Sequence, residues 1–325
     1  MSQAELLREL RAVRDDAGLF RLAGRGVLEV LGSDRVRWLD GMISADVKTL
    51  AAFGAAPGLL LTRQGRIVAD LFVLARSDGF WLELEASALP TVQQRLTGYV
   101  IADDVTLRDR SAELVRLAVE GPHATDRLGA AGAELAGLAP DTWREVRLAE
   151  AAVTVAAYGF TGLGGFQLFV PSDAADAVTR ALLASGIAAA SSDTLECLRI
   201  VAGVPRLGRE LDESVLPAEA RLDAAIATGK GCYTGQEVVT RMRSRGRVGH
   251  LLVGLRFEAA MPPARGAEIH GPAGRIGQVT SSVLSPEAGA IGLGFVRAHA
   301  AEPGAGVRVD GADARIVELP MRPGA

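Results

Sequence analysis

The residues best suited to chemistry lie in one short segment, residues 229–237, whose sequence is GKGCYTGQE. Its three glycines allow positive φ angles or the close approach of a ligand. The other side chains offer an ammonium, a thiol, a phenol, an amide and a carboxylate, from Lys230, Cys232, Tyr233, Gln236 and Glu237. A lysine two residues from a cysteine favours the reactive thiolate over the thiol. We therefore take Cys232 as the candidate reactive residue of this Cys232 segment.

The alternative is that Cys232 is structural, because a free cysteine usually behaves as a small buried hydrophobe. Cys197 fits that description, since it lies in the apolar stretch TLECLRI. Glycines and polar side chains surround Cys232 instead, and they do not form an apolar pocket. We interpret Cys197 as structural and Cys232 as functional.

The Cys232 segment, with Arg241 four residues after Glu237, resembles the signature of the YgfZ-type folate-binding proteins. These are relatives of the glycine-cleavage T-protein, an aminomethyltransferase, and are implicated in making or maintaining iron–sulfur clusters. The resemblance extends over most of the chain. It implies an α+β, T-protein-like folate-binding fold of two subdomains with antiparallel sheets, followed by a small C-terminal β-barrel. It also implies that tetrahydrofolate or a derivative is the ligand.

Three further positions resemble the family's folate site. Asp70 lies in an apolar strand expected at 67–74, where the family uses an aspartate on the folate and the aminomethyl group; a buried aspartate needs partners. The family has paired aspartates there, whereas Ala69 precedes Asp70, which argues against aminomethyl transfer. Gln167 stands where the family has a pterin-binding glutamate, so we expect weakened or altered folate binding. Arg199 matches an arginine near the folate.

Other interpretations of these positions remain open. Asp70 suits an exposed strand position, and Arg199 suits a surface ion pair. On the resemblance, the expected folate-contacting residues are Asp70, Gln167, Arg199, Lys230, Tyr233, Gln236, Glu237 and Arg241.

The order of apolar patterns predicts how the site is positioned. Strands and helices follow one another in residues 1–112 and again in 113–192, as expected for two antiparallel α+β subdomains. We expect residues 193–245 to rejoin the first subdomain, so that 1–245 form the folate-binding region. Short glycine-rich apolar runs in residues 246–325 predict a small β-barrel or sandwich, and the resemblance favours the barrel.

An arginine occupies every second position after the Cys232 segment, at Arg241, Arg243, Arg245 and Arg247. On an extended chain these four side chains share one face. That face would suit a polyanion such as a folate polyglutamate tail or tRNA phosphates. A solvated run of charge is the alternative.

The composition of the chain argues against several other classes of protein. The chain has 325 residues, a net charge of −4 and a sequence pI of about 5.7, which argues against general coating of nucleic acid. Two cysteines of unlike context make no disulfide framework, and four histidines lack metal-ligand spacing, so we expect no permanently bound metal. No run approaches the ~20 apolar residues of a membrane span, and the N-terminus has no apolar signal core. We expect a soluble cytoplasmic protein.

Our hypothesis from the sequence is a folate-binding accessory protein of iron–sulfur cluster assembly or repair, and so indirectly of tRNA modification. Its partners would be iron–sulfur enzymes or cluster-assembly proteins. Cys232 would ligate iron transiently, hold a sulfur species or form an adduct with a folate one-carbon group. One alternative is a folate-dependent one-carbon transferase or demethylase. Another is a scaffold that binds a protein or tRNA and whose pocket is vestigial.

Overall fold

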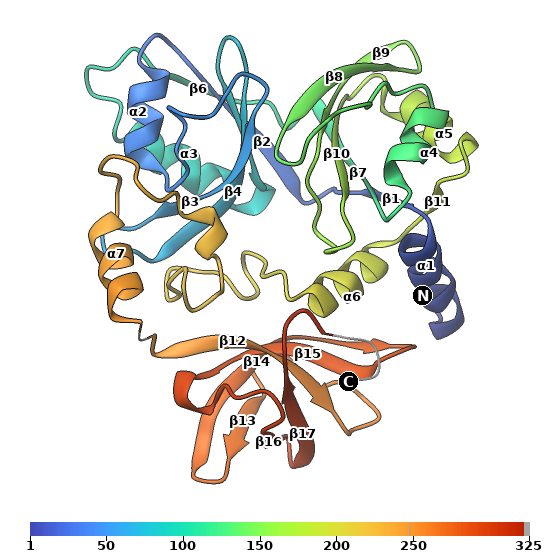
Figure 1. Ribbon diagram of the computed structural model, residues 1–325, viewed down its shortest axis with the longest axis vertical. Coiled ribbons are helices and arrows are strands. Elements are labelled where there is room, and N and C mark those ends of the chain that lie inside the picture. Colours follow the sequence, from blue (N-terminus) through green and yellow to red (C-terminus); the bar gives the residue numbers. More distant parts are fainter. Residues whose placement is uncertain (247, 322–325) are drawn as a thin grey trace.

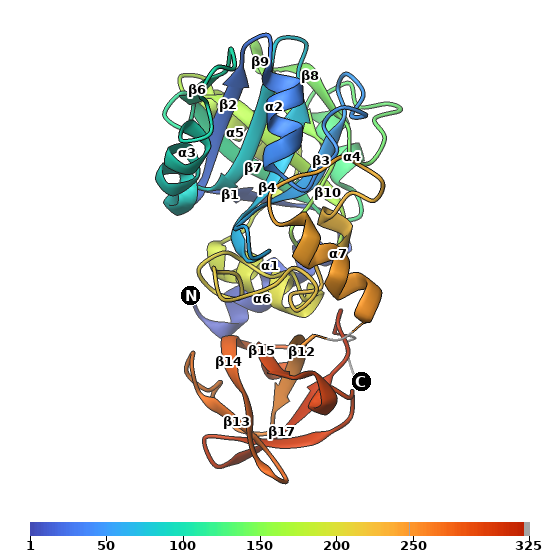
Figure 2. The ribbon, with the colours of Figure 1, turned by 90° about the vertical axis from the view of Figure 1, so that its left-hand side faces the viewer.

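The computed structural model describes residues 1–246 and 248–321 of the chain. Two β-sheets lie side by side, and a closed β-barrel lies beyond them (Figure 1). This arrangement confirms the predicted α+β fold with two sheet-containing subdomains and a C-terminal barrel. The side view shows the barrel separated from both sheets by a layer of helix and loop (Figure 2).

The first sheet is antiparallel and carries two helices on its outer face. Its strands, in spatial order, are β3 (Ala55–Leu61), β4 (Ile67–Ala75), β5 (Phe80–Glu85), β2 (Arg25–Leu31) and β6 (Thr106–Asp109). Trp38 and Leu39 of helix α2 (Arg35–Met42) and Val92 of helix α3 (Leu89–Thr97) pack against it in one core. Because β4 alternates its side chains between faces, every second residue is left for the opposite, inner face.

The second sheet has the same plan. Its strands, in spatial order, are β11 (Ala188–Ala189), β1 (Gly18–Arg21), β7 (Leu114–Glu120), β10 (Gly165–Pro171), β9 (Ala151–Ala156) and β8 (Trp143–Leu148). Helices α4 (Ala124–Ala130) and α5 (Ala175–Ala184) cover its outer face. The inner faces of the two sheets meet through Val27, Leu74, Trp81 and Phe169.

Strand β1 departs from the predicted division. We expected residues 1–112 in the first subdomain, but Gly18–Arg21 pair with β7 and β11 of the second sheet. The β1–β11 pair is also parallel in an otherwise antiparallel sheet. The chain therefore passes from one sheet to the other between Arg21 and Arg25, and this crossing brings the β1–β2 connection to the junction of the two sheets.

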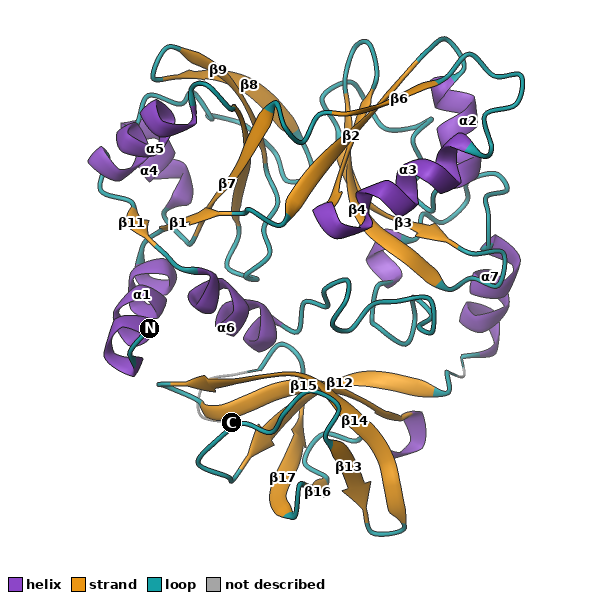
Figure 3. Cartoon of the chain, turned by 180° about the vertical axis from the view of Figure 1, so that it is seen from behind, coloured by secondary structure: helices purple, strands orange, loops and turns teal. Residues whose placement is uncertain are grey.

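Helices α1 (Gln3–Asp15) and α6 (Ser192–Ala202) lie between the second sheet and the barrel (Figure 3). Ile200 of α6 packs with Leu252, Ile291 and Leu293 of the barrel, so the barrel shares a core with the helix. The barrel strands, in spatial order, are β12 (His250–Phe257), β15 (Gly289–Arg297), β14 (Gly274–Ser285), β13 (Glu268–Gly271), β16 (Gly306–Val309) and β17 (Ala312–Val317). Single-turn 3-10 segments are η1 (Ala86–Ala88), η2 (Asp223–Ala225) and η3 (Ala298–Ala300).

The prediction of an extended arginine face was wrong. Residues Gln236–Arg245 form helix α7, so Arg241 and Arg243 are about 200° apart around the helix axis rather than on one face. Arg243 donates to the backbone oxygen of Asp223, and Arg241 pairs with Glu237 at 2.6 Å. Arg245 ends the helix, and Arg247 lies outside the described residues. The basis for a linear polyanion contact is therefore removed.

Candidate functional site

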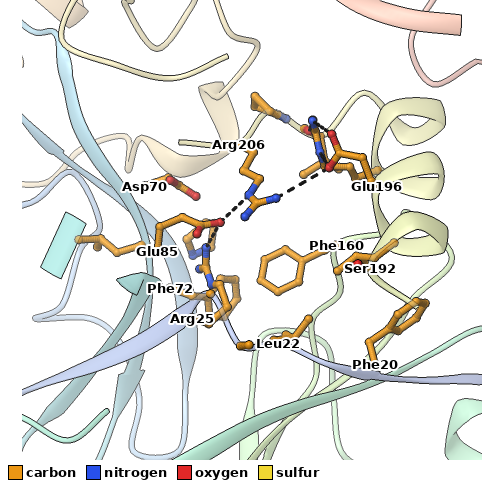
Figure 4. Close-up of a pocket in the computed structure, with 18 of the residues that line it drawn as sticks. Phe20, Leu22, Arg25, Asp70, Phe72, Glu85, Phe160, Ser192, Glu196 and Arg206 are labelled. Carbon is orange, nitrogen blue, oxygen red and sulfur yellow. Dashed lines mark hydrogen bonds and ion pairs between the residues drawn. The ribbon is translucent and has the colours of Figure 1, made fainter. Parts of the chain in front are cut away.

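A cavity of about 350 Å³ lies where the two sheets and helix α6 meet (Figure 4). We call it the central cavity. Its wall comes from the β1–β2 connection, β3 and β4, the loop before β10, α6 and the chain that follows α6. Most of the lining is apolar, with Phe20, Leu22, Phe72 and Phe160 among it. A mostly apolar cavity of this size with a few polar groups is the usual form of a small-molecule site.

Asp70 projects from β4 into the central cavity. Its Oδ1 atom is buried and accepts no hydrogen bond from the described residues. Burial raises the pKa of the Asp70 carboxyl, and nearby Glu85 adds to this while Arg25 opposes it. A buried carboxylate oxygen without a donor is costly, so its presence in a cavity indicates a place for a ligand donor or proton. Asp70 therefore lines a cavity, and the alternative of an exposed strand position is excluded.

Ala69 corrects one sequence inference. We counted the missing carboxylate at Ala69 against aminomethyl transfer, but Ala69 is fully buried in the core on the outer face of the sheet. Asp70 lies on the other face, because successive strand residues alternate. A carboxylate at position 69 would therefore enter the core rather than the cavity. The absence of a second aspartate says little about chemistry beside Asp70.

Glu85 and Arg25 provide charge next to Asp70. Leu71 pairs with Leu84 across β4 and β5, which puts Asp70 and Glu85 at the next cross-strand position. The Glu85 carboxylate is 3.6 Å from Arg25 and 2.9 Å from Arg206. Arg25 is itself held by Glu83 through two hydrogen bonds of 2.7 and 2.5 Å. Glu85 therefore has cationic partners, while among the described residues Asp70 has none within hydrogen-bonding distance.

Arg199 lines the same cavity, but its hydrogen bonds go to the protein. It makes a two-bond contact with Glu196, and it also donates to Glu210, Ser281 and the oxygen of Val204. Its side chain is only 5% exposed, so the surface-ion-pair alternative is excluded. The guanidinium joins α6, the chain after it and barrel strand β14. Arg199 fixes one wall of the cavity and has few donors left for a ligand.

Gln167 is not among the residues that line the central cavity. It is fully buried in β10 and donates to the Glu120 carboxylate at 2.9 Å. Glu120 also accepts from the backbone of Phe160 and Thr161 at 2.9 and 2.8 Å. Burial raises the pKa of Glu120, against the effect of these donors. Gln167 and Glu120 therefore do not line the cavity themselves. They hold the loop that brings the Phe160 ring to it.

The Cys232 segment lies against the first sheet, and its lysine is an anchor. The Lys230 side chain is 1% exposed and donates to the backbone oxygens of Asp40, Ile43 and Ala45 at 2.6–2.9 Å. Its Nζ atom is also 3.2 Å from the Asp40 carboxylate. Burial lowers the pKa of Lys230 in spite of that ion pair. Lys230 is thus committed to helix α2 and the chain after it through these bonds, and its expected effect on the Cys232 thiol stays a prediction.

Other residues of the Cys232 segment are also structural. Tyr233 is buried with Leu59 and Ile67, and burial raises its pKa. Gly235 has a φ of +83°, and a Cβ there would stand 2.5 Å from the backbone oxygen of Thr62. Gln236 accepts from the Tyr233 amide at 3.3 Å, and Glu237 is on the surface.

Cys232 itself is exposed, whereas Cys197 is buried as predicted. None of the predicted folate contacts Lys230, Tyr233, Gln236, Glu237 and Arg241 lines the central cavity. Of the predicted contacts, the structure brings only Asp70 and Arg199 together around it.

The sequence analysis missed Arg25, Glu85, Phe160 and Arg206, all of which line the cavity. Glu85 could have been identified from the sequence, because it ends the apolar strand FWLELE. Like Asp70, it is a carboxylate that would need partners if the strand is buried. Arg25 and Arg206 could not, since isolated arginines in turn-rich sequence are ordinary surface residues.

Metal-binding side-chain groups and membrane-spanning helices are both absent from the described residues, 1–246 and 248–321. These residues contain no group of three or more His, Cys, Asp or Glu side chains arranged to hold a metal ion. No helix among them is long and apolar enough to cross a membrane.

Comparisons with known proteins cover nearly the whole chain. Residues 2–230 match the GCVT N-terminal domain, and residues 251–321 match the glycine cleavage T-protein C-terminal barrel domain. An aminomethyltransferase of Rubrobacter xylanophilus is 31% identical over 98% of this chain and 86% of its own length. One from Geobacillus kaustophilus is 32% identical over 94% of this chain and 86% of its own length. The crystal structure of the glycine cleavage system aminomethyltransferase T from Bartonella henselae has the same fold, with a TM-score of 0.88, 24% identity and coverage of 97% and 89% of the two chains.

Proposed function

This chain belongs to the glycine cleavage T-protein family, and we propose that it binds a reduced folate in the central cavity and acts there as a one-carbon transferase. The observation that carries the proposal is the buried Asp70 Oδ1 atom, which faces the cavity without a hydrogen-bond donor. The relatives named aminomethyltransferase support the reaction class, and they are matched over most of their length.

The residues of the cavity fit a folate. A pterin is flat and largely apolar on its faces, which suits a wall of Leu22, Phe72 and Phe160. Its ring nitrogens carry N–H donors, which suit the unpartnered oxygen of Asp70. Tetrahydrofolate supplies the secondary amines that accept and carry a one-carbon unit. Gln167 is not expected to contact the pterin directly, since it does not line the cavity and its NH2 group donates to Glu120.

Asp70 has two roles in this proposal. It accepts a hydrogen bond from the ligand, which orients the reacting nitrogen, and it takes up or returns the proton that this nitrogen loses or gains. Its raised pKa brings the carboxyl closer to neutral pH, where a proton acceptor of this kind is most effective. Arg25 and Glu85 set the local charge, and the apolar wall limits the access of water.

Tetrahydrofolate binding by isothermal titration calorimetry tests the proposal. Under anaerobic conditions we expect saturable one-to-one binding to the full chain, with a negative heat-capacity change from apolar burial. Methylenetetrahydrofolate should then form from tetrahydrofolate and a small aminomethyl donor. Binding without any turnover would refute the proposed transferase activity but not the proposed folate site. The absence of binding would refute both parts of the proposal.

A second candidate function concerns Cys232. Its thiol is exposed, and the buried Lys230 two residues earlier anchors the segment to the backbone oxygen of Ala45. The thiol is therefore accessible and held in place. This supports the accessory role in iron–sulfur cluster assembly or repair that the sequence suggests, with the client proteins meeting the thiol at the surface.

We expect Cys232→Ser to leave tetrahydrofolate affinity within twofold of the original, because Cys232 is not part of the cavity wall. In cells, the same variant should lower the activity of iron–sulfur enzymes, and Cys197→Ala, at the buried cysteine, serves as the control. Normal activity of those enzymes with Cys232→Ser would reject the accessory role without affecting the cavity proposal.

A further inference from the structure

Arg206 differs from Arg25 and Arg199, which also line the central cavity, in how few of its donors are used. Its Nε atom donates to Glu85 at 2.9 Å, and its Nη1 atom is 3.9 Å from Glu196, too far for a hydrogen bond. Its terminal nitrogens make no hydrogen bond within the described part of the chain. Arg199, by contrast, makes five hydrogen bonds to the protein, and Arg25 makes two to Glu83.

Arg206 is also placed to meet a ligand. Its guanidinium reaches across the cavity between Glu85 of β5 and Glu196 of α6 (Figure 4). The side chain is 45% exposed, so the unused donors face the open side of the cavity rather than the core.

The backbone of Arg206 is fixed although its side chain is not. Its amide donates to Glu210 at 3.1 Å, and its carbonyl accepts from the amides of residues 209–211 at 3.0–3.1 Å. Glu210 is held in turn by Arg199 and Ser281. The root of the side chain therefore has a defined position, and little further ordering is needed to bind a ligand.

We propose that Arg206 recognises a carboxylate of the ligand in the central cavity, namely the glutamate end of the reduced folate. The inference rests on the proposed folate site. A guanidinium with free terminal N–H groups binds a carboxylate through two parallel hydrogen bonds. Glu85 remains compensated when Arg206 turns to the ligand, because Arg25 stays 3.6 Å from the same carboxylate. Arg206 thus selects folates that keep their glutamate carboxylates over neutral pterins.

The test compares tetrahydrofolate with its glutamate dimethyl ester, in which two methyl groups remove both carboxylate charges. Dissociation constants are measured by anaerobic calorimetry on the full chain and on Arg206→Gln, Arg206→Lys and Arg21→Gln. Arg21 also lines the cavity, and its exposed side chain makes no hydrogen bond or ion pair with the described residues. Arg8→Gln, on the exposed surface of α1, controls for the change in net charge.

We expect Arg206→Gln to raise the dissociation constant of tetrahydrofolate at least tenfold and that of the diester less than twofold. Arg206→Lys should have an intermediate effect on tetrahydrofolate binding. Arg8→Gln should change neither dissociation constant. An equal loss for both ligands in Arg206→Gln would mean that Arg206 only supports the cavity wall, and would overturn the inference. So would selective loss in Arg21→Gln with none in Arg206→Gln. If the original chain binds neither ligand, the proposed folate site itself is wrong.

Discussion

Replacing Asp70 with asparagine is expected to lower the rate of methylenetetrahydrofolate formation by about 100-fold or more, the usual contribution of a positioned proton acceptor. The amide has the size of the carboxylate but neither its charge nor its ability to take a proton. Tetrahydrofolate should bind more weakly as well, since Oδ1 is the unpartnered acceptor in the cavity. Steady-state kinetics at saturating tetrahydrofolate separates the loss of rate from the loss of affinity.

The same substitution should stabilise the fold. Asp70 places a carboxylate oxygen in a buried position without a donor, and asparagine removes the cost of burying that charge. We expect an increase of about 1–2 kcal/mol in the free energy of unfolding at neutral pH, measured by urea denaturation. A variant that is inactive and also less stable would indicate that Asp70 is a structural residue.

The pH dependence of this effect has a defined sign. The pKa of Asp70 is raised in the folded state, so the folded chain holds this proton more tightly than the unfolded chain. Between the unfolded pKa, about 3.9, and the raised folded pKa, the contribution of Asp70 to stability therefore falls as pH rises. The advantage of Asp70→Asn should be small below about pH 4 and grow above it. Asp78→Asn, at an exposed aspartate in the next turn, is the control for the substitution itself.

Replacing Lys230 with methionine is expected to cost about 3 kcal/mol of folding free energy, because removal of one partner of a buried ion pair leaves the other uncompensated. Three backbone oxygens, of Asp40, Ile43 and Ala45, would lose their shared donor. The Asp40 carboxylate, which is 2% exposed, would keep only the partner supplied by Lys48. Urea denaturation of the purified variant measures the loss.

Lys48→Met is the matched control for Lys230→Met. Lys48 also contacts the Asp40 carboxylate, at 3.0 Å, but its side chain is 53% exposed. An exposed ion pair contributes about 1 kcal/mol or less, so this variant should be nearly as stable as the original. Limited proteolysis should cut the Cys232 segment faster in Lys230→Met only. Equal destabilisation by the two substitutions would show that Lys230 does not anchor the segment.

Local patterns were sufficient to predict the architecture. Apolar alternation and helical periodicity depend on near neighbours along the chain, which is why the α+β order and a C-terminal barrel or sandwich followed from the sequence, with the family resemblance favouring the barrel. The buried position of Cys197 followed from its apolar neighbours in the same way, whereas the exposure of Cys232 was decided only by the tertiary structure.

The remaining assignments depended on contacts between distant residues. The Lys230 ammonium donates its hydrogen bonds to oxygens some 190 residues earlier, at positions 40–45. The Gln167 side chain donates to Glu120 and does not line the cavity. Arg206 enters the cavity because Glu85, far away in the sequence, lies beside Asp70 across two paired strands. A sequence states which side chains carry charge and hydrogen-bonding groups. Which partners use them is decided by the tertiary structure, because a buried polar group must find its partner wherever the fold brings one.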